Sequence, residues 1–398
     1  MMKINIATWL GSLLALCCPA IATAATPAGA IGDSLPARAD LDGKKLEKHV
    51  YQLASPEFAG RSGNPANKTI AYIEKHFSSL NLKPAFASGY VQDVVQAGEA
   101  GGKRIGRNIA ARVEGSDPVL SREYIIVSAH WDHLGASRDG KKVFAGADDN
   151  ASGVAMLLES ASWFARAENR PARSMLFVAF DLEEFGLFGS RYFAAHLPVE
   201  ESAIRLFITA DMIGRSLSGI CREWVFVMGT ERLPQSRDWL KQAQAGKKFK
   251  AGLMGTDLVG VRSDYGPFMA RKVPYLFFST GESKVYHTAD DKPETLDYEK
   301  LESVSEIICE TAARAARAEE IGRWSEKPVP TPEEMKVIAA VLEEMKSPAS
   351  GLKIGGLQMT TLEKTLESVK KMLAGGTISD ADRKAVIRAV QFLKLTVL

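Results

Sequence analysis

Residues 124–133, with the sequence YIIVSAHWDH, give the first indication of the fold. Residues 124–129 are almost continuously apolar, which is typical of a strand that is buried on both faces of a parallel sheet. The runs 174–180, 204–210 and 273–279 have the same character. Residues 152–167, between the first two runs, have a helical pattern. The order strand, helix, strand predicts an α/β fold with a mostly parallel, mixed central sheet and helices on both faces.

The N-terminal residues 1–24 have the order of a signal peptide. Lys3 is followed by an uncharged, mostly apolar run, and Ala22-Thr23-Ala24 fits the small-residue cleavage rule. The alternative is a lipoprotein anchored at Cys17 or Cys18. The residue before either cysteine argues against it, because a small residue is expected there. We therefore expect an exported protein, periplasmic or secreted.

The remaining chain shows no global attraction to nucleic acid or to a membrane. The formal net charge is +2, and removal of Lys3 with the signal peptide would leave about +1. No later segment has the ~20 consecutive apolar residues that a membrane span needs. Cys221 and Cys309 would survive cleavage, and whether they pair stays open.

The rest of the sequence divides into three parts. Residues 25–41 are rich in Ala, Pro and Gly and are expected to form a flexible leader. Residues 42–325 are expected to form the main domain. The start signals Thr331-Pro332, Thr360 with Glu363, and Ser379 with Asp382 predict a small helical appendage over residues 326–398. It could dock on the main domain or mediate an oligomer.

Acidic residues and histidines follow the predicted strands, at the edge of the sheet where α/β proteins bind ligands. They are His130 and Asp132 after the first strand, Asp148 and Asp149 before the helix, Glu183 and Glu184 after the second strand, Asp211 after the third, and Tyr286 and His287 after the fourth. Each group alone has an ordinary explanation, such as a helix cap or a solvated helix start. Together they suit two hydrolytic metal ions, because His, Asp and Glu without thiolates are the ligands of such sites.

These motifs, in this order, resemble the co-catalytic zinc aminopeptidases of the bacterial leucyl aminopeptidase type, which have glutamate carboxypeptidase and glutaminyl cyclase as relatives. The resemblance runs from about Leu53, through LASPEFAGR at 53–61 and RNIAA at 107–111, to about Ala313. It implies two Zn²⁺ ions per chain, and it implies a zinc peptidase domain over residues 42–325. Trp131 stands where many relatives have tyrosine.

The resemblance also implies roles for individual residues. His130 and Asp211 would hold one zinc ion, Glu184 and His287 the other, and Asp149 would bridge them. Glu183 would be the general base, and Asp132 would orient the metal-binding histidine. The bond between Asp149 and Asn150 would be cis, as it is in relatives.

The expected function is removal of N-terminal residues from peptide substrates. Around the motifs the acids Asp132, Asp148, Asp149, Glu183, Glu184, Asp211, Asp264, Asp290 and Asp291 face only the bases Arg215, Arg262 and Lys284, which favours a free amine. Tyr286 is the candidate donor to the oxyanion. The alternatives are a carboxypeptidase or dipeptidase, with Arg262 binding a carboxylate, a glutaminyl cyclase-like enzyme, and a non-catalytic binding protein.

Overall fold

The computed structural model describes residues 38–398 except 64, 97–101, 329–330 and 377. The expected signal peptide and most of the expected leader lie outside the described residues. Among the described residues, no helix has the length and apolar character needed to cross a membrane.

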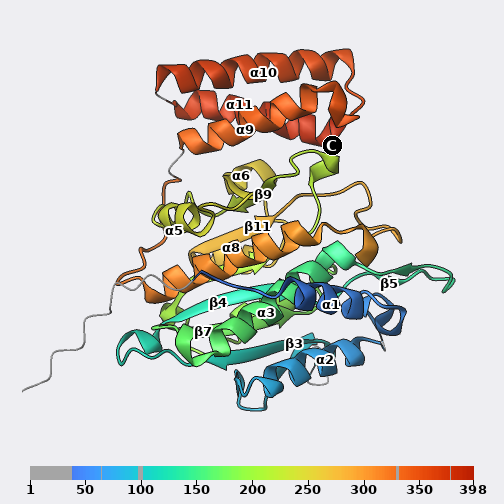
Figure 1. The fold of residues 1–398 in the computed structure, drawn as a ribbon, viewed down its shortest axis with the longest axis vertical. Helices are drawn as coiled ribbons and strands as arrows, with labels where there is room; N and C mark the ends of the chain where they lie inside the picture. The colour runs from blue at the N-terminus through green and yellow to red at the C-terminus, as the bar shows by residue number, and fades with distance from the viewer. Residues whose placement is uncertain (1–37, 64, 97–101, 329–330, 377) are drawn as a thin grey trace, which may run out of the picture. The chain divides into compact units, whose positions relative to one another are not determined.

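A nine-stranded mixed sheet forms the centre of the main domain (Figure 1). Its order is β1-β3-β7-β4-β8-β11-β9-β10, and β2 pairs with β3. The strands are β1 Lys83–Pro84, β2 Val91–Gln96, β3 Lys103–Val113, β4 Tyr124–His130, β7 Ser174–Phe180, β8 Ile204–Ala210, β9 Trp224–Met228, β10 Lys250–Leu253 and β11 Tyr275–Ser279. A separate hairpin pairs β5 Gly135–Ala136 with β6 Val143–Phe144.

The four apolar runs of the sequence form neighbouring parallel strands. β4 pairs in parallel with β7 and β8, and β8 pairs in parallel with β11. The antiparallel strands β3 and β9 flank this group. The predicted mixed α/β sheet is therefore confirmed.

Helices cover both faces of the sheet because alternate residues of each strand point to opposite sides. In β4, Ile125 and Val127 belong to one core and Ile126 to the other. The first core is covered by α1 Gly43–Leu53, α2 Ala66–Ser79, α3 Gly153–Ala165, α5 Ser236–Ala243 and α8 Tyr298–Arg317. The second contains side chains of α4 Phe188–Ala195, α6 Thr256–Val259 and α7 Tyr265–Ala270.

The C-terminal appendage consists of α9 Pro332–Lys346, α10 Gly356–Gly375 and α11 Asp380–Val397. Thr331 caps α9 by accepting a hydrogen bond from Glu334 N, and Ser379 caps α11 in the same way. The predicted helix start at Thr360 is wrong. α10 begins one turn earlier, and the Thr360 hydroxyl donates to Gly356 O inside the helix.

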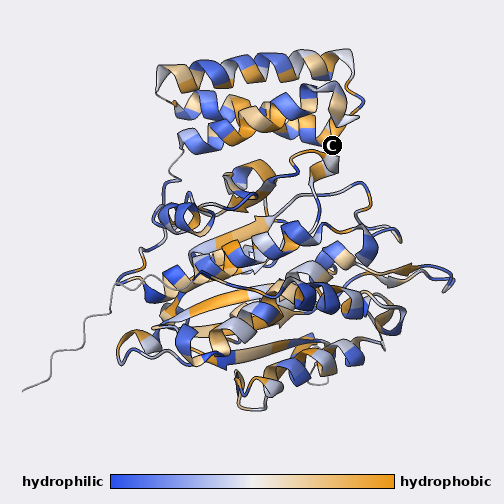
Figure 2. Cartoon of the chain, in the orientation of Figure 1, coloured by the Kyte–Doolittle hydropathy of each residue, from blue (hydrophilic) through white to orange (hydrophobic). Residues whose placement is uncertain are grey.

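The three appended helices pack together and share the second core with the sheet. Figure 2 shows hydrophobic residues in orange and hydrophilic residues in blue interspersed along these helices. α9 contacts β10, and α11 contacts α6. Met335 and Leu342 of α9 and Leu393 of α11 are fully buried in this core. The apolar faces of the three helices therefore pack within the same chain, as one of the two expectations for the appendage had it.

Arg383 joins α11 to α9 and α6 through two carboxylates. Its guanidinium donates to both oxygens of Glu334, at 2.6 and 2.7 Å, and to both oxygens of Asp257, at 2.6 and 2.8 Å. Glu334 is 4% exposed and also accepts a hydrogen bond from Gly255 N. Paired geometry of this kind fixes orientation as well as distance.

We predict that Arg383→Met lowers the free energy of unfolding by about 3 kcal/mol, because it leaves the buried carboxylate of Glu334 without its partner. Urea denaturation of the full chain measures the change. The control is Arg388→Met, at an exposed position of the same helix, which should change stability by less than about 0.5 kcal/mol. Equal effects of the two substitutions would contradict this role of Arg383.

Candidate metal centre

The candidate ligands meet at the edge of the sheet where its four parallel strands end. His130 is the last residue of β4, Asp211 follows β8, and Glu184 lies four residues after β7. Asp149 lies in the turn that precedes α3, and His287 lies in the segment between β11 and α8. Leu182, Met212 and His287 have positive φ angles of 58°, 56° and 55°. The chain therefore turns sharply just after β7 and β8, and again at His287 itself.

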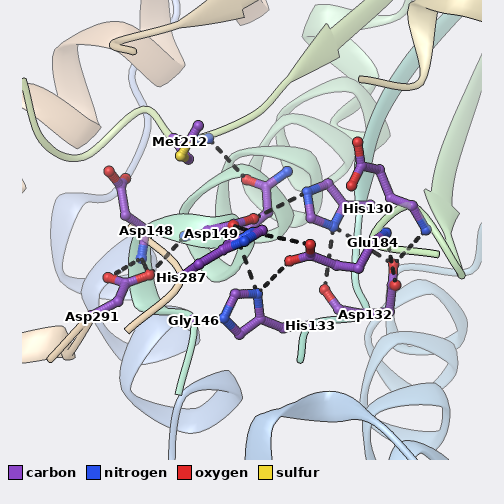
Figure 3. Close-up of polar contacts among 12 residues, drawn as sticks. His130, Asp132, His133, Gly146, Asp148, Asp149, Glu184, Met212, His287 and Asp291 are labelled. Atoms are coloured by element: carbon purple, nitrogen blue, oxygen red, sulfur yellow. Dashed lines mark hydrogen bonds and ion pairs between the residues drawn. The ribbon is translucent and has the colours of Figure 1, made fainter. Parts of the chain in front are cut away.

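The two carboxylate oxygens of Asp149 face different partners. Oδ1 lies 3.3 Å from His130 Nε2, which is also 3.3 Å from Asp211 Oδ1. Oδ2 lies 3.1 Å from His287 Nε2, which is 3.0 Å from Glu184 Oε2. Figure 3 shows the imidazoles converging on Asp149 and Glu184. The structure thus brings together all five candidate ligands, with Asp149 in the shared position.

His133 joins the second group, although the sequence assigned it no role. Its Nδ1 lies 2.7 Å from Glu184 Oε1 and 3.7 Å from Asp149 Oδ2, and its side chain is fully buried. Together, His133, Asp149 and Glu184 form a possible three-ligand set, as do His130, Asp149 and Asp211. His287 approaches both carboxylates of the second set more evenly than His133 does, so we assign His287 as the ligand and His133 as its buried neighbour.

The site fits divalent cations. Several buried atoms of the candidate ligands lie close to oppositely charged groups but make no hydrogen bond. Among the described residues, these atoms include His130 Nε2, His287 Nε2 and Asp211 Oδ1. Buried polar atoms are rarely left in this state, so a missing partner has to be explained. Two cations shared by Asp149 would satisfy these atoms. Imidazole and carboxylate are both ligands of Zn²⁺.

The electrostatics of the site also favour positive charge. Burial opposes a charge on His130, but the carboxylates of Asp211 and Glu183 outweigh it and raise its pKa well above the usual value. Burial opposes a charge on His287 as well, and Asp149 and Glu184 raise its pKa to about 10. The imidazoles are therefore held as cations by an excess of carboxylate, a role that bound metal ions would take over.

Asp132 holds the neighbouring loop in place. Its Oδ1 lies 3.6 Å from His130 Nδ1 and accepts a hydrogen bond from Glu183 N, and its Oδ2 accepts one from Glu184 N. Glu183 itself lines a cavity together with Asp149 and Asp211. Burial raises the pKa of Glu183 well above its usual value, and His130 partly opposes this shift.

Tyr286 lies beside the candidate ligands. Its ring stacks on His287 with a centroid distance of 3.8 Å, and it lines the same cavity as Glu183. Burial and the nearby Asp149 and Asp211 raise the pKa of its hydroxyl, so Tyr286 stays protonated and able to donate.

Two residues to which the sequence assigned no separate role hold the turn that carries Asp149. Asp291 accepts hydrogen bonds from Asp148 N and Asp149 N and binds Arg215 at 2.8 Å. Arg61, fully buried, donates to the carbonyls of Leu53, Trp131, Ala145, Gly146 and Asp149 at 2.7–3.1 Å. The bond between Asp149 and Asn150 is cis, which confirms the expectation. The only signal for Arg61 was its place in the motif at 53–61.

We predict that Arg61→Lys lowers the free energy of unfolding of the metal-free chain by about 2–4 kcal/mol, because an ammonium with three donors cannot serve five carbonyls. Zinc affinity should fall about 10- to 100-fold, as for other residues that support ligands from behind. Urea denaturation and competition with a chromophoric chelator measure the two effects. Arg138→Lys, at an exposed position, is the control. Unchanged zinc affinity in Arg61→Lys would rule out the supporting role.

Known proteins resemble this chain over its central part. Leupeptin-inactivating enzyme 1 of Streptomyces exfoliatus is 27% identical over 284 residues, which cover 69% of this chain and 58% of that enzyme. Aminopeptidase YwaD of Bacillus subtilis is 25% identical over 233 residues, which cover 56% of this chain and 47% of YwaD. The chain thus spans about half the length of these relatives.

Solved structures share the fold. The LapA aminopeptidase of Legionella pneumophila superposes with a TM-score of 0.57 at 18% identity, over 70% of this chain and 72% of LapA. A Bacteroides thetaiotaomicron glutaminyl cyclase bound to N-acetylhistamine superposes with a TM-score of 0.56 at 20% identity, over 71% of this chain and all of the cyclase. The sequence model of peptidase family M28 matches residues 108–312, which include every candidate ligand, and the chain therefore belongs to peptidase family M28.

Proposed function

We propose that this chain is a zinc-dependent aminopeptidase that releases the N-terminal residue of peptides. The observation that carries the proposal is the position of Asp149, whose two oxygens are divided between His130 with Asp211 and His287 with Glu184. This arrangement suits two Zn²⁺ ions with a shared carboxylate. Membership of family M28 and the similarity to aminopeptidases support the same activity.

Glu183 is the proposed general base. Zinc, when bound, polarises the scissile carbonyl and makes water more acidic. Glu183 faces the cavity beside Asp149 and Asp211, where its carboxylate takes a proton from water and passes it to the leaving amine. Burial raises the pKa of Glu183 above its usual value, which makes its carboxylate a stronger base, and the positive charge of His130 opposes part of this shift. Tyr286 would donate a hydrogen bond to the developing oxyanion.

The charges around the cavity favour a substrate amine over a substrate carboxylate. Among the residues that line the cavity, the acidic side chains outnumber the basic ones. Arg262, the candidate for binding a substrate carboxylate, lies 3.7 Å from Glu282 and is partly neutralised by it. We therefore prefer an aminopeptidase to a carboxypeptidase. Residues 1–24 support export to the periplasm or the medium.

We predict that Glu183→Gln and Glu184→Gln have different effects. Glu183→Gln should keep about two zinc ions per chain and lose roughly 10²- to 10⁴-fold in kcat, because only proton transfer is removed. Glu184→Gln should lower the zinc content, because it removes a ligand. Elemental analysis and steady-state kinetics on one preparation measure both. Retention of near-wild-type kcat by Glu183→Gln would exclude it as the base, and a wild-type stoichiometry of one zinc or less, despite added zinc, would exclude the two-metal site.

The substrate end is tested with one peptide in free, N-acetylated and C-amidated forms. Acetylation removes the amine and should lower kcat/KM far more than amidation does. The opposite order would indicate a carboxypeptidase. Equal rates for the three forms would indicate an endopeptidase.

A further inference from the structure

A cavity of about 150 Å³ opens beside the candidate metal centre. Asp149, Glu183 and Asp211 line one end, and the remaining wall is mostly apolar. Phe226 and Met228 of β9 and Phe277 of β11 supply part of that wall from the sheet. An apolar cavity that meets a few polar groups at one end is the usual form of a small-molecule site.

The C-terminal helices supply another part of the wall. Val341 and Met345 of α9 line the cavity, as do Val390 and Lys394 of α11 and the last residue, Leu398. In each helix the lining residues are four apart, which places them on one face. All five lie outside residues 108–312, the segment that matches the family. This wall is therefore a feature of this chain beyond the family's core.

The appended helices are fastened on both sides of the cavity. Besides the Arg383 contacts with Glu334 and Asp257, Glu344 of α9 accepts a hydrogen bond from Cys221 N at 2.7 Å. Near the chain end, Ser218 donates to Leu398 O at 3.2 Å. Because these contacts tie α9 and α11 to segments that flank the cavity, the wall has a defined position.

We propose that α9 and α11 form part of the substrate site, where they receive the side chain of the N-terminal residue and select for long apolar side chains. This inference rests on the proposed aminopeptidase function, since it assigns the amine to the end of the cavity at Asp149, Glu183 and Asp211. The side chain then points along the apolar wall toward Val341 and Val390.

The composition of the wall indicates which side chains it takes. Four methionines line the cavity, Met212, Met228, Met254 and Met345, and their flexible thioethers adapt to side chains of different shape. Lys394 adds a positive charge next to Arg262. Leucine, methionine and phenylalanine fit this mostly apolar wall.

The test compares Val390→Trp with Leu395→Trp, two substitutions on opposite faces of α11. Val390 lines the cavity, and Leu395 is 82% exposed. Val390→Trp should fill the cavity and lower kcat/KM for leucine p-nitroanilide at least about tenfold relative to alanine p-nitroanilide, because alanine does not reach the wall. Leu395→Trp should leave this ratio unchanged.

A second substitution works in the opposite direction. Val341→Ala should enlarge the cavity and raise kcat/KM for phenylalanine p-nitroanilide about threefold or more relative to the alanine substrate. If the unfolding temperature shows that Val390→Trp does not fold, Val341→Ala alone tests whether α9 and α11 contribute to selectivity. Both substitutions should leave the zinc content at its wild-type value.

The outcomes separate this proposal from the proposed function. If the wild-type chain cleaves none of the substrates, the aminopeptidase function fails, and this inference fails with it. If the wild-type chain is active and a folded Val390→Trp lowers both substrates equally or neither of them, the aminopeptidase function stands and the proposed role of α9 and α11 is wrong.

Discussion

The arrangement of this protein depends on the concentration of negative charge at one edge of its sheet. Asp149, Glu184 and Asp211 are brought within hydrogen-bond range of the same imidazoles. Carboxylates so close in a buried setting repel one another and lose hydration, so they require compensating cations. Burial opposes the charge on Asp149, yet the ion pairs with His130 and His287 keep its pKa well below the usual value. Zinc ions would supply the same compensation more strongly.

A charged site of this kind needs a rigid support, and the structure provides it from behind. The guanidinium of Arg61 donates hydrogen bonds to five backbone carbonyls in three segments of the chain. One of these carbonyls is that of Asp149. Asp291 fixes the same turn through backbone N–H groups. Fixing the backbone of a ligand fixes the direction of its carboxylate, which is the condition for a shared ligand to face two ions at once.

The apolar half of the site is assembled differently. Strands β9 and β11 form its floor, and helices from the last part of the chain close one side. The charged half is held by hydrogen bonds within the main domain, whereas the apolar half depends on packing between that domain and the appendage. The proposed chemistry and the proposed selectivity thus lie in different parts of the chain, so substitutions on α9 and α11 can alter one without the other.

The sequence by itself determined the α/β class and the four parallel strands, and its motifs singled out the five candidate ligands through their resemblance to zinc aminopeptidases. It could do so because apolar runs and the polar residues that end them are local patterns, and the carboxyl ends of parallel strands share one edge. The position of His133 could not be predicted because β4 ends at His130. The alternation of an extended strand therefore does not tell where the residues after His130 point. The supporting roles of Arg61 and Asp291, and the wall formed by Val341 and Val390, were missed for a different reason. Their partners lie far away in the chain, and only tertiary packing brings such residues together.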